Sequence, residues 1–193
     1  MMRSLQTRLG VGLSISLLVL FGLQWLIVSE SIRYLAEESV AARLRRDSEL
    51  LLAALRLSPA DGAPSLDPGR IDPIFQRPFS GHYYRIIVGD RLLRSRSLWD
   101  EDLAMGRAGV GESLRSSVPG PQKQRLLMLV SGYRKQQHVV TIAVAEDLSA
   151  IRAEIGQFQA RYGLVSLAIL ALLMVIQRLI VKRSLFPLER TRR

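Results

Sequence analysis

The chain has 193 residues, a formal net charge of +10 and no cysteine. Without cysteine it can hold no disulfide, no thiolate zinc site and no cysteine nucleophile. Its mean hydropathy is positive at +0.16 although 23% of its residues are charged, so the apolar residues must be concentrated locally. They lie in two uncharged runs, Leu9–Ser29 and Tyr162–Gln177, and this distribution excludes a soluble cytosolic enzyme.

The first apolar run predicts a transmembrane helix over residues 9–28. About 20 residues at about 1.5 Å each match a hydrocarbon core of roughly 30 Å. A cleaved signal peptide is the alternative, because Arg3 and Arg8 form a positive N-terminal region. The run is longer than a usual signal-peptide core, and Val28–Glu30 is a poor cleavage site, so we favour an uncleaved anchor.

The second run predicts a transmembrane helix over residues 162–181, with Arg178 near enough to its end to reach the headgroups. The outer flanks, residues 1–8 and 182–193, carry most of the basic excess: seven Lys or Arg residues against one acid. The positive-inside rule therefore predicts that both termini are cytoplasmic and that residues 29–161 lie across the lipid bilayer. Because the charge belongs to these flanks, it does not indicate a nucleic-acid surface.

The central segment predicts an α+β domain. Apolar residues at spacings of four and seven predict a helix over residues 30–57, continuous with the first span. Four prolines then predict a loop over residues 58–73. Two hairpins follow, and their four strands predict an antiparallel sheet. The predicted strands are residues 83–88 and 91–96 around a Gly89-Asp90 turn, and residues 125–133 and 138–145.

Side-chain alternation predicts how this sheet is covered. Residues 139–145 are apolar on both faces, so we expect this strand to be central and buried on both sides. Tyr83 and Tyr84 point to opposite faces, which predicts one core and one surface tyrosine. Glu146 and Asp147 are expected to begin a helix that runs into the second span. Helices that continue into both spans are the geometry of a transmembrane signal carrier.

Four stretches carry a resemblance to a known family. They are Pro78–Tyr84, Leu93–Asp100, Val144–Leu148 and Arg183–Arg190. In this order and spacing the chain resembles the input half of bacterial two-component sensor histidine kinases. The resemblance implies a PAS-like extracytoplasmic sensor over residues 29–161 and a HAMP linker that opens at Pro187 and Leu188. It further implies a homodimer in the bacterial inner membrane, a periplasmic central domain and a cognate response regulator where a kinase core exists.

The chain departs from this family in its chemistry. A complete kinase would continue with a phosphoacceptor histidine and glycine-rich ATP boxes, whereas His82 and His138 lack the acidic and basic context of a phosphoacceptor. We therefore predict no catalytic residues and no cofactor in these residues, since ATP and magnesium belong to the kinase core. The chain is either part of a longer receptor or a stand-alone two-span envelope assembly or partner-binding protein. The input half of a chemoreceptor or of a cyclic-nucleotide enzyme is a further alternative.

Two charged groups are candidates for ligand sensing. Arg85, Arg94 and Arg96 on neighbouring strands could bind an anion, because guanidinium groups suit carboxylate or phosphate. The acidic triplet Asp100, Glu101 and Asp102 could bind a divalent cation. In both cases ordinary solvated or locally paired side chains are the alternative. Neither histidine has a second ligand at metal-binding spacing, so no metal site is predicted.

Overall fold

The computed structural model describes residues 2–58 and 63–184. The chain divides into two compact units. One consists of Leu35–Arg152 and contains the sheet, and the other consists of Met1–Tyr34 with Ala153–Arg193 and contains the apolar parts of two helices. The helices are α1, Met2–Ala54, and α2, Ser149–Ser184. Each therefore continues from one unit into the other without a break, which confirms the predicted helix continuity.

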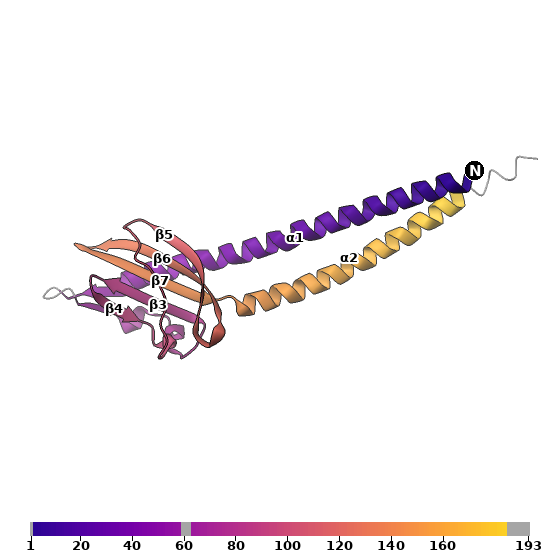
Figure 1. Cartoon of the computed structure of the whole chain (residues 1–193). Helices are drawn as coiled ribbons and strands as arrows, with labels where there is room; N and C mark the ends of the chain where they lie inside the picture. The colour runs from indigo at the N-terminus through magenta and orange to yellow at the C-terminus, as the bar shows by residue number, and fades with distance from the viewer. Residues whose placement is uncertain (1, 59–62, 185–193) are drawn as a thin grey trace, which may run out of the picture. The chain divides into compact units, whose positions relative to one another are not determined.

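The sheet unit is built on a five-stranded antiparallel sheet in the order β4-β3-β7-β6-β5 (Figure 1). The strands are β3 (His82–Val88), β4 (Arg91–Arg94), β5 (Ser113–Pro119), β6 (Arg125–Lys135) and β7 (His138–Asp147). Both predicted hairpins are confirmed, and Gly89 makes its turn at a φ of +57°. The sequence predicted four strands for this sheet and missed the fifth, β5, which pairs along its length with β6.

The two faces of the sheet bury different partners. On one face α1 packs through Val40, Leu44 and Leu51 against alternate residues of β3, β6 and β7. On the other face Leu98, Leu103 and their neighbours cover the intervening residues. β7 is therefore central and covered on both sides, as predicted. The prediction that either Tyr83 or Tyr84 is a surface residue was wrong, because both faces are covered and both side chains are buried.

The segment after α1 was predicted only in part. The helix ends at Ala54, and β1 (Leu55–Leu57) pairs with β2 (Pro64–Leu66) where a helix end and a loop were expected. Four short 3-10 helices complete the sheet unit. They are η1 (Pro68–Arg70), η2 (Pro73–Gln76), η3 (Arg96–Leu98) and η4 (Pro121–Lys123).

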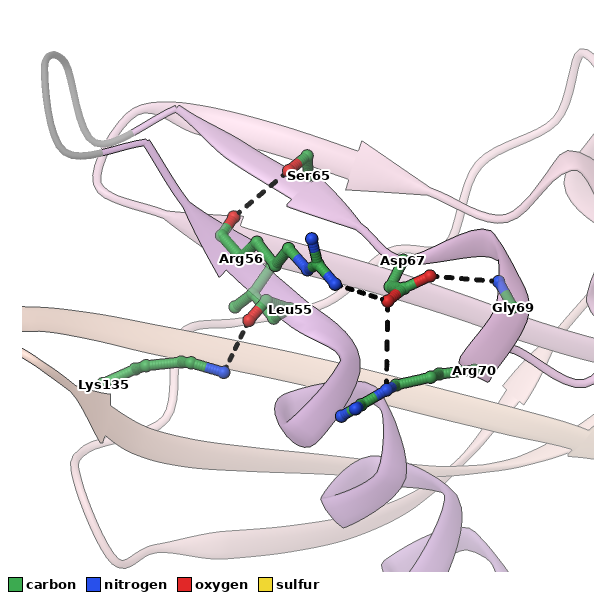
Figure 2. A network of polar contacts seen from close by, with 7 residues as sticks. All are labelled: Leu55, Arg56, Ser65, Asp67, Gly69, Arg70 and Lys135. Atoms are coloured by element: carbon green, nitrogen blue, oxygen red, sulfur yellow. Dashed lines mark hydrogen bonds and ion pairs between the residues drawn. The ribbon is translucent and has the colours of Figure 1, made fainter.

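A polar network stabilises the end of α1 (Figure 2). The Lys135 ammonium, at the tip of the β6–β7 hairpin, donates to the carbonyl of Leu52 at 2.6 Å and to that of Leu55 at 2.5 Å. Cations favour these positions because the last carbonyls of a helix lack intrahelical partners. Nearby, Asp67 pairs with Arg56 at 2.7 Å and accepts from the backbone N–H of Gly69, which ties β1 to the turn after β2.

In the second unit the apolar parts of α1 and α2 lie antiparallel. The amide of Gln24 donates to the Tyr162 hydroxyl at 2.8 Å, and the Trp25 and Tyr162 rings stack at 5.8 Å. Toward the other end, Gln177 donates to the carbonyl of Gly10 at 3.0 Å. By length and composition both helices could cross a membrane. Most of their large apolar side chains are exposed.

Candidate functional site

A partly buried ion pair joins α1 to the end of β7. The Arg43 guanidinium donates to both carboxylate oxygens of Glu146, with Nε–Oε2 at 2.9 Å and Nη2–Oε1 at 2.5 Å. The Glu146 side chain is only 8% exposed, whereas that of Arg43 is 48% exposed. Two parallel charge-assisted hydrogen bonds are the most directional form of such a pair. Glu146 is thus compensated inside the sheet unit by one cation that water still reaches.

Asp47 lies one helical turn beyond Arg43 on α1 and is partly buried. The pKa of its carboxyl is raised, first by burial and then by the negative charge of Glu146. Asp72 raises it slightly further, while His82 and Arg43 act in the opposite direction. Among the described residues the Asp47 carboxylate takes part in no hydrogen bond or ion pair. Arg43 is occupied by Glu146, so Asp47 is a surplus negative charge beside a buried one.

His82 completes this group from β3. It is the residue directly opposite Glu146 in the β3–β7 ladder, so both side chains are on the sheet face that α1 covers. The Nδ1 atom of His82 is buried and has no hydrogen-bond partner among the described residues. A buried polar atom without a partner costs about 1–3 kcal/mol, which marks this position as unusual. We refer to Arg43, Asp47, His82 and Glu146 as the junction.

The junction is close in sequence to the start of α2. Asp147 follows Glu146, and its backbone N–H donates to the carbonyl of Gly81 at 2.8 Å. Its carboxylate accepts from the backbone N–H of Ser149 at 2.9 Å and so caps α2. Leu148 donates its N–H to the carbonyl of Arg125 at 3.0 Å. The expected acidic helix start is therefore confirmed for Asp147 and wrong for Glu146, which is held in β7 by Arg43.

Sequence reasoning missed the junction, although a signal for it was present. Arg43 and Asp47 lie on α1 beside the buried positions Val40, Leu44 and Ser48, so both were candidates for partial burial. Glu146 continues the alternation of the buried β7 residues by two positions. A charged residue at the end of an apolar face needs a partner. The partner's identity depends on which part of the sheet α1 covers, and this the sequence did not show.

The predicted arginines hold a loop against the opposite face of the sheet. Arg85 pairs through Nη2 with Asp102 at 3.2 Å and donates through Nη1 to the carbonyl of Leu103. Arg94 is the residue opposite Arg85 in the β3–β4 ladder, and it donates to the carbonyl of Glu101 at 2.8 Å. The structure therefore brings Arg85, Arg94 and Asp102 together. Of these donors, the Nε of Arg85 is buried and has no partner among the described residues.

The side chains of the remaining predicted site residues take no part in these contacts. Arg96 was expected on a strand but begins η3, since β4 ends at Arg94. The side chains of Arg96, Asp100 and Glu101 are exposed and make no hydrogen bond or ion pair among the described residues. Within the part of the chain that the structure describes, no three His, Asp or Glu side chains are grouped to hold a metal ion. Pro187 and Leu188 lie outside the described residues.

Comparison with known proteins gives one informative match. The chain is similar to a sensor protein kinase. It is 38% identical to the sensor protein kinase CarS of Pseudomonas aeruginosa over 99% of its own length. The chain spans 42% of the length of that protein. No family model and no solved structure matches it.

Proposed function

We propose that the chain is the membrane-embedded input module of a two-component sensor histidine kinase. The observation that carries this proposal is the similarity to a sensor protein kinase over 99% of the chain. The α+β architecture, with one helix continuous into each apolar segment, supports it. The sheet unit would receive the signal, and α2 would carry it to a HAMP linker at Pro187 and Leu188.

The proposed topology has residues 1–8 and 182–193 in the cytoplasm and the sheet unit, as a PAS-like domain, in the periplasm. The basic residues that flank the two apolar segments support this orientation in the inner membrane. The exposed apolar side chains of α1 and α2 support contact with lipid. By analogy with sensor kinases, the partners would be a second copy of the chain and a response regulator.

The geometry at the start of α2 suggests how a signal would pass. Asp147 and Leu148 tie the first turn of α2 to the carbonyls of Gly81 and Arg125. These two hydrogen bonds and the one from the Ser149 N–H to the Asp147 carboxylate fix the start of α2 to the sheet. A displacement of β7 within the sheet unit would therefore move the start of α2. Because α2 is one continuous helix, that movement would reach its C-terminal end.

The topology can be tested with single cysteines, because the chain has none of its own. Ser117→Cys places a thiol on exposed β5, and Thr191→Cys places one in the predicted cytoplasmic segment. In intact spheroplasts a membrane-impermeant maleimide should label Ser117→Cys and should label Thr191→Cys only after lysis. Labelling of Thr191→Cys in intact spheroplasts, or protection of Ser117→Cys, would contradict the proposed orientation.

A further inference from the structure

Two polar contacts join the apolar parts of α1 and α2 at widely separated levels. At one level the Gln24 amide donates to the Tyr162 hydroxyl at 2.8 Å, and the Trp25 ring stacks on that of Tyr162. At the other level the Nε2 atom of Gln177 donates to the carbonyl of Gly10 at 3.0 Å. All of these residues belong to one compact unit, so the contacts describe how the two helices pair within a single chain.

The two levels agree on a single antiparallel register. Trp25 and Gly10 are 15 positions apart on α1. Tyr162 and Gln177 are the same number of positions apart on α2. At about 1.5 Å per residue, the two contacts are about 22 Å apart along each helix. A slide of α2 by one helical turn, about 5.4 Å, would therefore break both hydrogen bonds together.

Gln177 is a polar residue on the seam between the helices, and it is only 9% exposed. The Gly10 carbonyl that it binds also accepts from the Ser14 hydroxyl at 2.8 Å. The Oε1 atom of Gln177 is buried and has no partner among the described residues. A single buried polar residue on a helical seam lowers stability but selects one register, because any other register leaves all of its polar atoms in an apolar setting.

Gly163 makes the other level closely packed. A Cβ atom at this position would lie 3.0 Å from two ring atoms of Trp25, so the indole lies against bare backbone. A slide of α2 by one turn in either direction would place Gln159 or Leu167 where Gly163 now lies. Both of these residues carry a side chain that the indole leaves no room for, so packing and hydrogen bonding select the same register.

We propose that Gln24, Tyr162 and Gln177 lock α1 and α2 of one chain into a transmembrane hairpin of fixed register. The consequence for signalling rests on the proposed function: where α2 carries a signal across the membrane, α1 of the same chain moves with it. The signal then reaches the cytoplasm as movement of the hairpin as a whole, and not as a slide of α2 along α1.

Disulfide crosslinking in inner-membrane vesicles tests the register, because the chain has no cysteine of its own. The register places Leu17 opposite Leu170 and one turn away from Met174, and both of these α2 residues are at least partly buried. After oxidation the protein is solubilised and cut at a protease site inserted between residues 60 and 61. An intrachain disulfide is the product that runs as a monomer before cleavage and as joined halves after it.

The measured quantity is the ratio of two intrachain crosslinking rates. The matched pair is Leu17→Cys with Leu170→Cys, and the shifted pair is Leu17→Cys with Met174→Cys. An interhelical hydrogen bond in a membrane favours its register by roughly threefold on average. With two such bonds, we expect the matched pair to crosslink roughly tenfold faster than the shifted pair. Equal rates for the two pairs would overturn the proposal.

Variants assign the register to the named side chains. Gln177→Leu, and separately Tyr162→Phe, should each lower the ratio by roughly threefold. Ser16→Leu is the control, because Ser16 is an exposed polar residue of α1 whose side chain makes no hydrogen bond among the described residues, and it should leave the ratio unchanged. A ratio that stays the same in Gln177→Leu or in Tyr162→Phe would overturn the proposal. Neither result alters the labelling expected in the topology experiment, so the two failures are distinguishable.

Discussion

Replacing Arg43 by methionine would leave the Glu146 carboxylate without its cation. Breaking a fully buried ion pair from one side costs about 3–5 kcal/mol, whereas an exposed pair contributes about 0–1 kcal/mol. Glu146 is 8% exposed but Arg43 is 48% exposed, so water can partly compensate the loss. The free energy of unfolding should therefore fall by about 2 kcal/mol for Arg43→Met at neutral pH.

The chain offers a matched control for this substitution. Arg115 pairs with Glu38 at 3.0 Å and likewise joins the sheet to α1, but both side chains are largely exposed, at 43% and 56%. Arg115→Met should cost less than about 1 kcal/mol. Denaturant unfolding of the full chain in detergent micelles measures both, with the fluorescence of Trp99 as a probe in the sheet unit.

The double variant Arg43→Met, Glu146→Gln removes the uncompensated charge and should recover about half or more of the lost stability. Equal losses for Arg43→Met and Arg115→Met would refute the argument from burial. A double variant no more stable than Arg43→Met would refute the assignment of the loss to Glu146.

Three further predictions concern the core, the surplus acid and the end of α1. Leu44 is 1% exposed, so Leu44→Ala should lower the free energy of unfolding by about 3 kcal/mol in denaturant unfolding. Leu50 is 59% exposed, so Leu50→Ala should change this free energy by less than about 0.5 kcal/mol. The raised pKa of Asp47 means that the folded chain binds this proton more tightly than the unfolded chain, so stability rises as the pH falls through the native pKa. Asp47→Asn should therefore raise the Tm at neutral pH. It should change the Tm little in acid that protonates Asp47 in the folded and the unfolded chain. An equal rise in Tm at neutral and acidic pH would contradict this direction of the pKa shift. Lys135→Met removes the hydrogen bonds to the carbonyls of Leu52 and Leu55, where α1 ends and β1 begins, and should cost about 1–2 kcal/mol by thermal unfolding. An unchanged Tm would show that water replaces the ammonium.

Local signals in the sequence were sufficient for much of the fold. The two uncharged runs and the four-residue spacing after them predicted continuous helices, because burial on one helical face requires that period. Gly89-Asp90 predicted a hairpin, since its turn needs a positive φ that glycine adopts without strain. The apolar alternation on both faces of residues 139–145 correctly predicted a central strand. Each of these signals lies within a few neighbouring residues.

The features that were missed depend on contacts between distant residues. β5, Ser113–Pro119, is exposed on both faces and has no apolar alternation, so only its pairing with β6 makes it a strand. Tyr83 and Tyr84 are both buried because a separate segment covers the second face of the sheet.

The candidate sites show the same limit. Arg85 and Asp102 were both named as candidates, but from two different hypothetical sites, and the structure joins them in one ion pair. Arg43 and Glu146 are 103 positions apart, so their pairing follows from the packing of α1 on the sheet and not from a local pattern. Charged residues were therefore identified more reliably than their partners.

The central proposal is that this chain forms the input module of a sensor histidine kinase. It is tested most directly by recovering the native protein from its own membrane with an antibody to residues 67–78 and incubating it with radiolabelled ATP. We predict a labelled band well above the 21.6 kDa of the present sequence, with an acid-labile phosphate typical of phosphohistidine. A band at 21.6 kDa that takes up no phosphate and co-purifies with no kinase would contradict the claim.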